Sequence, residues 1–200
     1  FGKFDYLFPG IRKKKETILL VLAYGHPDHT NGGWKAGFPF VPSTFEQRAA
    51  YFAYLQAVVE HFHGPDIAYQ IWNEPNIKKY WTLTATDFGT LLKEATEAIR
   101  KINPTATIVA AGIANEKNRD DFVREMTRTS GTDQIAAFAF HPDRQDGPEN
   151  SLPDIAKFEN ISGATRQRRS IWLTEWGYSE TWLSRMYPLD NLRERQAVMT

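Results

Sequence analysis

The chain alternates short apolar runs with longer segments of helical periodicity, and this alternation constrains its fold more than any other feature. The apolar runs cover residues 17–24, 67–72, 107–111, 135–140 and 170–174. They are largely continuous rather than alternating, as expected of parallel strands that are buried on both faces. Five such strands separated by helices predict an α/β fold with a parallel sheet and right-handed crossovers.

Helical segments lie between these strands, and the first of them carries clear end signals. Ser43 or Thr44 can cap it, with Glu46 or Gln47 in the capping-box position, and Gly-Pro at 64–65 ends it. The predicted helices cover residues 45–63, 86–102, 118–129 and 152–166, with further helices over 6–15 and from 189 onward.

Two folds share this order of elements. A doubly wound open sheet usually carries a Gly-rich phosphate loop after an early strand, and Gly25-His26-Pro27 does not supply one. We therefore predict a (β/α)8 TIM barrel, present here as an incomplete barrel of about five βα units. Residues 1–200 would form one domain, truncated at both ends. Because open sheet edges expose unpaired backbone groups, we expect the rest of the polypeptide or another chain to complete the ring.

Composition narrows the set of partners. Lysine plus arginine number 24, as do aspartate plus glutamate, so no global field favours nucleic acid or an anionic membrane. The absence of cysteine excludes a disulfide framework, a thiolate metal site and a cysteine nucleophile. No stretch reaches the ~20 apolar residues of a membrane span. These features leave the compartment open, with a secreted or periplasmic location favoured over a cytoplasmic one.

Two short acidic motifs stand where parallel α/β folds place their chemistry. Residues 71–76 read Ile-Trp-Asn-Glu-Pro-Asn and residues 172–177 read Trp-Leu-Thr-Glu-Trp-Gly. Glu74 and Glu175 therefore stand at the C-terminal ends of two predicted strands. Hydrolysis of a glycosidic bond needs one protonated carboxyl to assist the leaving oxygen and one carboxylate to attack or to activate water. A lone glutamate would more often be a solvated loop residue, but two in strand context favour a catalytic pair.

The surroundings of the two glutamates indicate how their roles divide. Glu74 is followed and preceded by aromatic residues, and desolvation there would favour its neutral, proton-donating form. Glu175 needs hydrogen-bond donors to stay charged, and His141 or Tyr178 could supply one.

Residues 73–75, Asn-Glu-Pro, and residues 174–177, Thr-Glu-Trp-Gly, resemble motifs of the retaining glycoside hydrolases of clan A. Within the clan, the form Trp-Asn-Glu-Pro-Asn at residues 72–76 looks most like family 39, the β-xylosidase and exopolysaccharide-hydrolase type, with family 5-like enzymes next. In that clan the acid/base glutamate ends the fourth barrel strand and the nucleophile ends the seventh, so strands 3 to 7 would be present here. The resemblance implies a retaining glycosidase of β-linked oligosaccharide or polysaccharide, without a cofactor. Glu74 would be the acid/base and Glu175 the nucleophile.

The resemblance also implies substrate-binding residues. Asn73 is expected to hydrogen-bond the 2-hydroxyl group of the sugar at the cleavage point, and its alternative role is an Asx turn before Pro75. His26 and His141 follow strands and are candidate ligand contacts. Candidates for stacking on sugar rings, any of which could instead pack in the core, are Trp34, Trp81, Trp176, Tyr178 and Trp182.

Two other functions stay open. A catalytically silent carbohydrate-binding barrel would keep the fold without turnover. A metal-dependent barrel hydrolase or isomerase would use His26, His29 and His141. The His-x-x-His spacing at 26–29 lacks a third placed ligand and is a weak signal, so we predict no metal site.

Overall fold

The computed structural model describes residues 1–29, 41–129, 132–142, 148–164, 169–177 and 185. Its centre is a sheet of five parallel strands whose order in space, β1-β2-β3-β4-β5, is their order in the chain. A doubly wound sheet would reverse this order part-way, so the structure is a partial TIM barrel, as predicted. The strands are β1 (Ile18–Leu22), β2 (Ile67–Ile71), β3 (Thr107–Ala114), β4 (Ala137–His141) and β5 (Ser170–Leu173).

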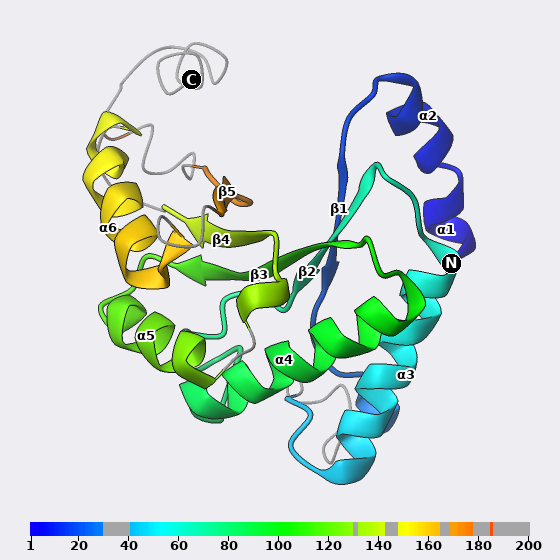
Figure 1. Ribbon diagram of the computed structural model, residues 1–200, viewed down its shortest axis with the longest axis horizontal. Helices are drawn as coiled ribbons and strands as arrows, with labels where there is room; N and C mark the ends of the chain where they lie inside the picture. The colour runs from blue at the N-terminus through cyan, green and yellow to red at the C-terminus, as the bar shows by residue number, and fades with distance from the viewer. Residues whose placement is uncertain (30–40, 130–131, 143–147, 165–168, 178–184, 186–200) are drawn as a thin grey trace.

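The longer helices lie along the outside of the curved sheet (Figure 1). They are α3 (Phe45–His61), α4 (Ala85–Ile102), α5 (Arg119–Thr129) and α6 (Leu152–Ser162), preceded by α1 (Gly2–Asp5) and α2 (Phe8–Lys13). Short 3-10 turns occupy η1 (Pro27–His29), η3 (Thr132–Gln134) and η4 (Pro148–Ser151). None of the described helices is both long and apolar enough to cross a membrane.

Capping residues set the helix boundaries. Thr44 begins α3 with a capping box to Gln47, which selects one of the two alternatives that the sequence offered. The helix predicted over 152–166 ends at Ser162, because Gly163 takes a left-handed conformation with φ of 73° and terminates it. The helix predicted over 6–15 is the shorter α2, which has a proline in its first turn, and α1 lies before the predicted range. The helix predicted from residue 189 lies outside the described residues.

The core has two layers of different character. Large side chains on the outer face of the sheet, such as Tyr69 and Ile71, pack against Leu91 and other residues of the helices. On the inner face, small residues dominate a second cluster that includes Ala68 and Ala139. Small inward residues let the strands curve closely around the barrel axis, and the polar groups of the strand ends lie above this layer.

One strand boundary differs from its prediction in a way that matters for the site. The strand predicted over 107–111 is longer in the structure, where β3 continues through Gly112 to Ala114. The register of β3 against β4 shifts between Val109 and Gly112, so the strand carries a bulge-like irregularity there. Such irregularities change the direction in which side chains project and are common beside active sites.

Candidate active site

The two predicted glutamates meet at one edge of the sheet. Glu74 follows β2 and Glu175 follows β5, and the carboxyl ends of parallel strands lie on the same side of a barrel. One carboxylate oxygen of each lies within 4.8 Å of the other, and both lie within that distance of a ring nitrogen of His141. Residues about 100 positions apart in sequence are thereby gathered into one constellation of ionisable side chains.

His141, the last residue of β4, links the two acids. Its Nδ1 is 3.1 Å from Glu74 Oε1 and 3.8 Å from Glu175 Oε2, and the side chain is fully buried. Its Nε2 is 3.1 Å from the hydroxyl of Thr174. A neutral ring that donates from Nδ1 to the Glu74 carboxylate must accept at Nε2, and the Thr174 hydroxyl can donate there. Both ring nitrogens are therefore occupied, which fixes the orientation of the ring between the acids.

Gly112 creates the space that this histidine needs. A Cβ atom at Gly112 would lie 2.1 Å from Nε2 and 2.6 Å from Cε1 of His141, far inside van der Waals contact. The glycine is therefore required for close approach of the imidazole to the backbone of β3.

The backbone of β3 also holds Glu74. The Glu74 N–H donates to the Gly112 carbonyl at 2.8 Å, and Asn73 forms an isolated parallel bridge with Gly112. Two residues further on, the side chain of Asn76 accepts from the Ala114 N–H at 3.0 Å and donates to its carbonyl at 2.9 Å. Asn76 thus replaces a strand partner, so the segment after β2 is tied to the end of β3.

The glutamates differ in exposure. The side chain of Glu74 is 13% exposed and that of Glu175 is 54% exposed. The hydrogen-bond donor expected for Glu175, His141, makes its closer contact with Glu74. Tyr178, the other expected donor, lies outside the described residues. The more enclosed carboxyl is the one to which the sequence assigned the proton-donating role.

Asn73 lies beside Glu74 in a small polar network. Gln70 Nε2 donates to Asn73 Oδ1 at 3.3 Å and to the Trp72 carbonyl at 3.0 Å. Tyr24, which follows β1, interacts with the side chains of Asn73, Glu74 and Glu175, each of which influences its pKa. Burial, partly offset by the bond from Asn73, raises the pKa of Tyr24 above its ordinary value, so its hydroxyl stays protonated. The Asx turn is therefore not needed to explain Asn73, whose side chain is engaged in this network.

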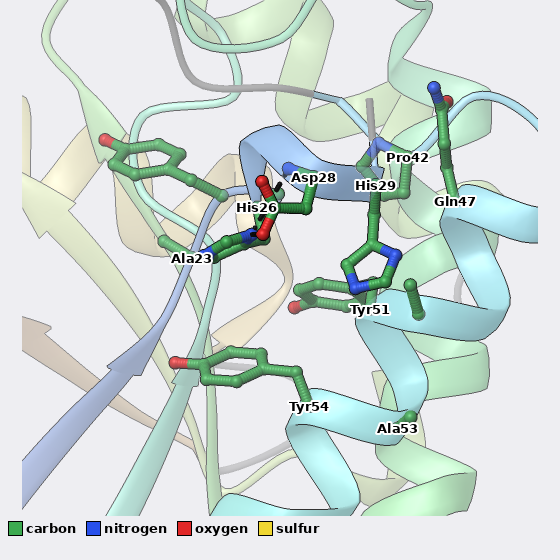
Figure 2. Close-up of a pocket in the computed structure, with 12 residues that line it drawn as sticks. Ala23, His26, Asp28, His29, Pro42, Gln47, Tyr51, Ala53 and Tyr54 are labelled. Carbon is green, nitrogen blue, oxygen red and sulfur yellow. Dashed lines mark hydrogen bonds and ion pairs between the residues drawn. The ribbon is translucent and has the colours of Figure 1, made fainter. Parts of the chain in front are cut away.

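A cavity of about 570 Å³ lies beside this network, between the segment after β1 and the first half of α3 (Figure 2). His26 lines it and faces Asp28, with its Nδ1 3.5 Å from the Asp28 carboxylate. Tyr51 and Tyr54 reach it from α3. Neither glutamate lines the cavity, but Tyr24 does, so this residue joins the cavity to the two acids.

The aromatic candidates separate into different groups. Trp81 is 2% exposed, donates its indole N–H to the Thr84 carbonyl and packs edge-on against Trp72. The stacking role predicted for Trp81 is therefore wrong, because its ring faces belong to the core. Trp176, directly after Glu175, is exposed and stays a candidate for stacking. Trp34, Tyr178 and Trp182 lie outside the described residues.

The three histidines of the metal-dependent alternative, His26, His29 and His141, do not form a metal-binding group among the described residues. Within the described segments, the group of three side chains with suitably close ligand atoms is Glu74, His141 and Glu175. His26 and His29 belong instead to the segment beside the cavity. The geometry therefore places His141 with the carboxylates rather than with the other histidines.

A family model described as cellulase, glycosyl hydrolase family 5, matches residues 27–195. The chain belongs to this family. Family 5 was the second of the two families that the motifs suggested, and the resemblance to clan A is confirmed. No curated protein matches the chain in a sequence search.

Solved structures of glycosidases share the fold of this chain. A glucosidase from Croceicoccus marinus has a TM-score of 0.61 and 15% identity, over 84% of this chain and 36% of its own. An endo-1,4-beta-mannanase from Rhizomucor miehei has a TM-score of 0.56 and 16% identity, over 98% and 63%. A family 39 beta-xylosidase from Caulobacter crescentus has a TM-score of 0.52 and 17% identity, over 76% and 37%. The family 5 chain thus spans roughly a third to two thirds of these proteins.

Several residues that shape this candidate site were not predicted as site residues. Gly112 and Thr174 act on His141 from neighbouring strands, and Tyr24 and Gln70 act on Asn73. Gln70 offers one signal that the sequence does contain. It is a polar residue inside an apolar run predicted to be buried on both faces, and buried polar groups require partners.

Proposed function

We propose that the protein is a retaining glycosidase that cleaves β-glycosidic bonds of an oligosaccharide or polysaccharide by double displacement. The observation that carries the proposal is the approach of the Glu74 and Glu175 oxygens to within 4.8 Å. Retaining enzymes keep their two carboxyl groups roughly 5–5.5 Å apart, whereas inverting enzymes need roughly 6.5–9.5 Å to admit a water molecule. The spacing supports direct attack by one carboxylate.

The unequal exposure of the two acids supports the division of roles. Glu74 is the more enclosed acid and protonates the leaving oxygen, while the more accessible Glu175 attacks the anomeric carbon. A glycosyl-enzyme forms on Glu175. Glu74, now ionised, then removes a proton from the water that releases the sugar with its configuration retained. His141, bonded to Glu74 and close to Glu175, holds the two carboxyl groups in position relative to each other through both steps.

The neighbouring groups suit a sugar substrate. Asn73 offers its amide to the 2-hydroxyl group at the cleavage point, a contact that strengthens in the transition state. Trp176 offers an exposed ring beside the nucleophile for stacking on a sugar face. The similar structures named above are a glucosidase, a mannanase and a xylosidase, which supports a β-linked pyranoside as substrate class.

Azide rescue of two glycine variants tests both the activity and the roles. Glu175→Gly should lose turnover of an aryl β-glycoside and regain it with azide. Because azide then attacks opposite the leaving group, the product should be the α-glycosyl azide. Glu74→Gly should yield the β-glycosyl azide, since azide there intercepts the covalent intermediate. Proton NMR distinguishes the two anomers.

The possible results are well separated. Exchanged anomers would mean that the roles of the two acids are exchanged. Unchanged turnover in either variant would remove that residue from the mechanism. If the full-length wild-type protein binds oligosaccharides in calorimetry but releases no sugar from any glycoside, the protein is a binding module and the proposal fails.

A further inference from the structure

Gln70 is a fully buried amide in β2, three residues before Asn73 and close to the inner layer of small side chains. Its Nε2 donates to the carbonyl oxygen of Trp72 at 3.0 Å. A backbone carbonyl can only accept a hydrogen bond, so the Gln70 atom that faces it must be the amide nitrogen and not the oxygen. The same nitrogen lies 3.3 Å from Asn73 Oδ1 and donates its second hydrogen there.

The orientation of the Gln70 amide determines the orientation of the Asn73 amide. With Oδ1 facing the Gln70 nitrogen, the NH2 group of Asn73 must point the other way, because the reversed amide would place donor against donor. On that side the Asn73 amide acts on the Tyr24 hydroxyl in the sense of a hydrogen-bond donor, because it lowers the pKa of Tyr24 that burial raises. One N–H of Asn73 then serves Tyr24, and the second is left for a ligand at the glutamates.

Tyr24 is itself held in place by neighbours. Its ring packs edge-on against Trp72 at 5.5 Å and stacks with Tyr80 at 6.1 Å between ring centroids. Its backbone has a φ of 72°, a conformation that a bulky residue adopts only when its surroundings impose it. Tyr24, which acts on one end of the Asn73 amide, is therefore held after β1, whereas Gln70, which donates to the other end, belongs to β2.

Keeping an amide at position 70 has a cost to folding. Gln70 Oε1 is buried and accepts no hydrogen bond from any residue in the described part of the chain. A buried acceptor left without a partner is unfavourable, so the amide at position 70 carries a cost that an apolar residue of the same size would not carry at that atom. Local rules of this kind are broken mainly where function requires it.

We propose that Gln70 is a positioning residue which, together with Tyr24, fixes the side-chain amide of Asn73 so that its free N–H donates to the 2-hydroxyl group of the sugar at the cleavage point. The proposal rests on the proposed glycosidase function and extends it to substrate specificity. It makes Gln70 and Tyr24 determinants of selectivity for glycosides that carry a free 2-hydroxyl, although Gln70 itself does not reach the substrate.

The test compares Gln70→Met with the wild type on two substrates. The probes are the 4-nitrophenyl β-glycoside that the full-length protein cleaves fastest and its 2-deoxy counterpart. Loss of an oriented hydrogen bond should lower kcat/KM by about 10-fold to 100-fold on the first probe, mainly through kcat. On the 2-deoxy probe the loss should stay within about 2-fold, because Asn73 has no hydroxyl to bind there. An equal loss on both probes would overturn the proposal.

Two further variants separate positioning from damage to the fold. Tyr24→Phe should show the same preference as Gln70→Met, and the double variant should lose less than the product of the two single losses. Thr96→Val removes another buried hydroxyl, bonded to Leu92 within α4, and should change neither probe. Urea unfolding of Gln70→Met checks that the variant is folded under the assay conditions, so that an equal loss on both probes remains the result that counts against the proposal.

Failure of the proposed function would be seen separately. If the wild type releases no 4-nitrophenol, the same probes are used in calorimetry. Gln70→Met should then weaken binding of the 2-hydroxy glycoside but not of the 2-deoxy glycoside. Equal affinities for the two glycosides in both proteins would overturn the inference in that case as well.

Discussion

Replacing Gly112 by alanine tests how the site is built. The added methyl carbon would lie 2.1 Å from Nε2, 2.6 Å from Cε1 and 3.1 Å from Cδ2 of His141. The near atoms belong to a ring that is fully buried and bonded at both nitrogens, so it has no free direction in which to move. The Gly112→Ala variant must therefore displace His141, the backbone of β3, or both.

The magnitude follows from these contacts. Forcing an extra methyl group into a packed core costs about 1–3 kcal/mol. Displacing His141 also removes its bond to the Glu74 carboxylate, and hydrogen bonds to charged groups contribute about 1.5–3 kcal/mol. If the free energy of the His141–Glu74 hydrogen bond is lost from the transition state, kcat/KM should fall by about 10-fold to 150-fold. We expect the free energy of unfolding to fall by about 1–3 kcal/mol as well.

The assay is a double-mutant cycle with His141→Ala, read by urea unfolding and by kcat/KM on an aryl glycoside. Once the imidazole is gone the methyl group has room, so Gly112→Ala should cost less than about 0.5 kcal/mol in that background. Gly10→Ala is the matched control, because a Cβ at Gly10 in α2 meets nothing within 4 Å. The reasoning fails if Gly112→Ala costs the same with and without His141.

Two further predictions concern stability alone. Burial raises the pKa of Tyr51 above its usual 10.0, so the stability linked to its protonated hydroxyl is fully present below pH 10 and is lost as pH rises further. Tyr51→Phe should therefore cost about 1 kcal/mol at pH 7, from loss of the 2.8 Å bond to the Leu22 carbonyl. Its unfolding free energy should then fall less steeply than that of the wild type above about pH 10, and parallel curves would contradict this. Thr84→Ala removes the hydroxyl that accepts from the Asp87 N–H at the start of α4, while the Thr84 backbone N–H still donates to the Asp87 carboxylate, and should cost about 0.5–2 kcal/mol in urea unfolding. Thr84→Ser keeps the capping hydroxyl and is the control, so its free energy of unfolding should stay near that of the wild type.

Much of the fold could be predicted because its signals are local. Continuous apolar runs mark strands buried on both faces, and the capping box at Thr44 and Gln47 lies within four residues of sequence. The end of α6 was missed by a few residues because Gly163 acts as a C-cap only once the helix has formed. The continuation of β3 past Gly112 was missed because it depends on register against another strand.

The site could be predicted only where chemistry and strand position coincide. Glu74, Glu175 and His141 each end or follow an apolar run, so parallel pairing alone brings them together. Trp81 lies close to Glu74 in sequence, yet the chain turns into α4 there and carries the ring into the core. A residue at a strand end could therefore be placed in the site from the sequence, but a residue several positions beyond the strand could not.

Adjacent residues at the end of β2 both serve the site, which a regular strand would not allow. Successive side chains of a strand point to opposite faces. Asn73 nevertheless bonds Gln70 and Glu74 bonds His141 at the same edge of the sheet. The backbone explains this, because Trp72 has a φ of 70° and Glu74 a φ of 47°, and these two left-handed residues break the alternation.

Left-handed residues other than glycine cost about 1–3 kcal/mol each, so this geometry needs support. Neighbouring strands supply it on both sides. The Trp72 N–H donates to the Leu22 carbonyl of β1 at 3.1 Å, and the Glu74 N–H donates to the Gly112 carbonyl of β3 at 2.8 Å. Since each left-handed residue is anchored to a strand of the sheet, the position of the Glu74 carboxyl is determined by the barrel itself rather than by the loop that follows it. A site supported in this way is pre-organised for a reaction whose two carboxyl groups must keep a fixed separation.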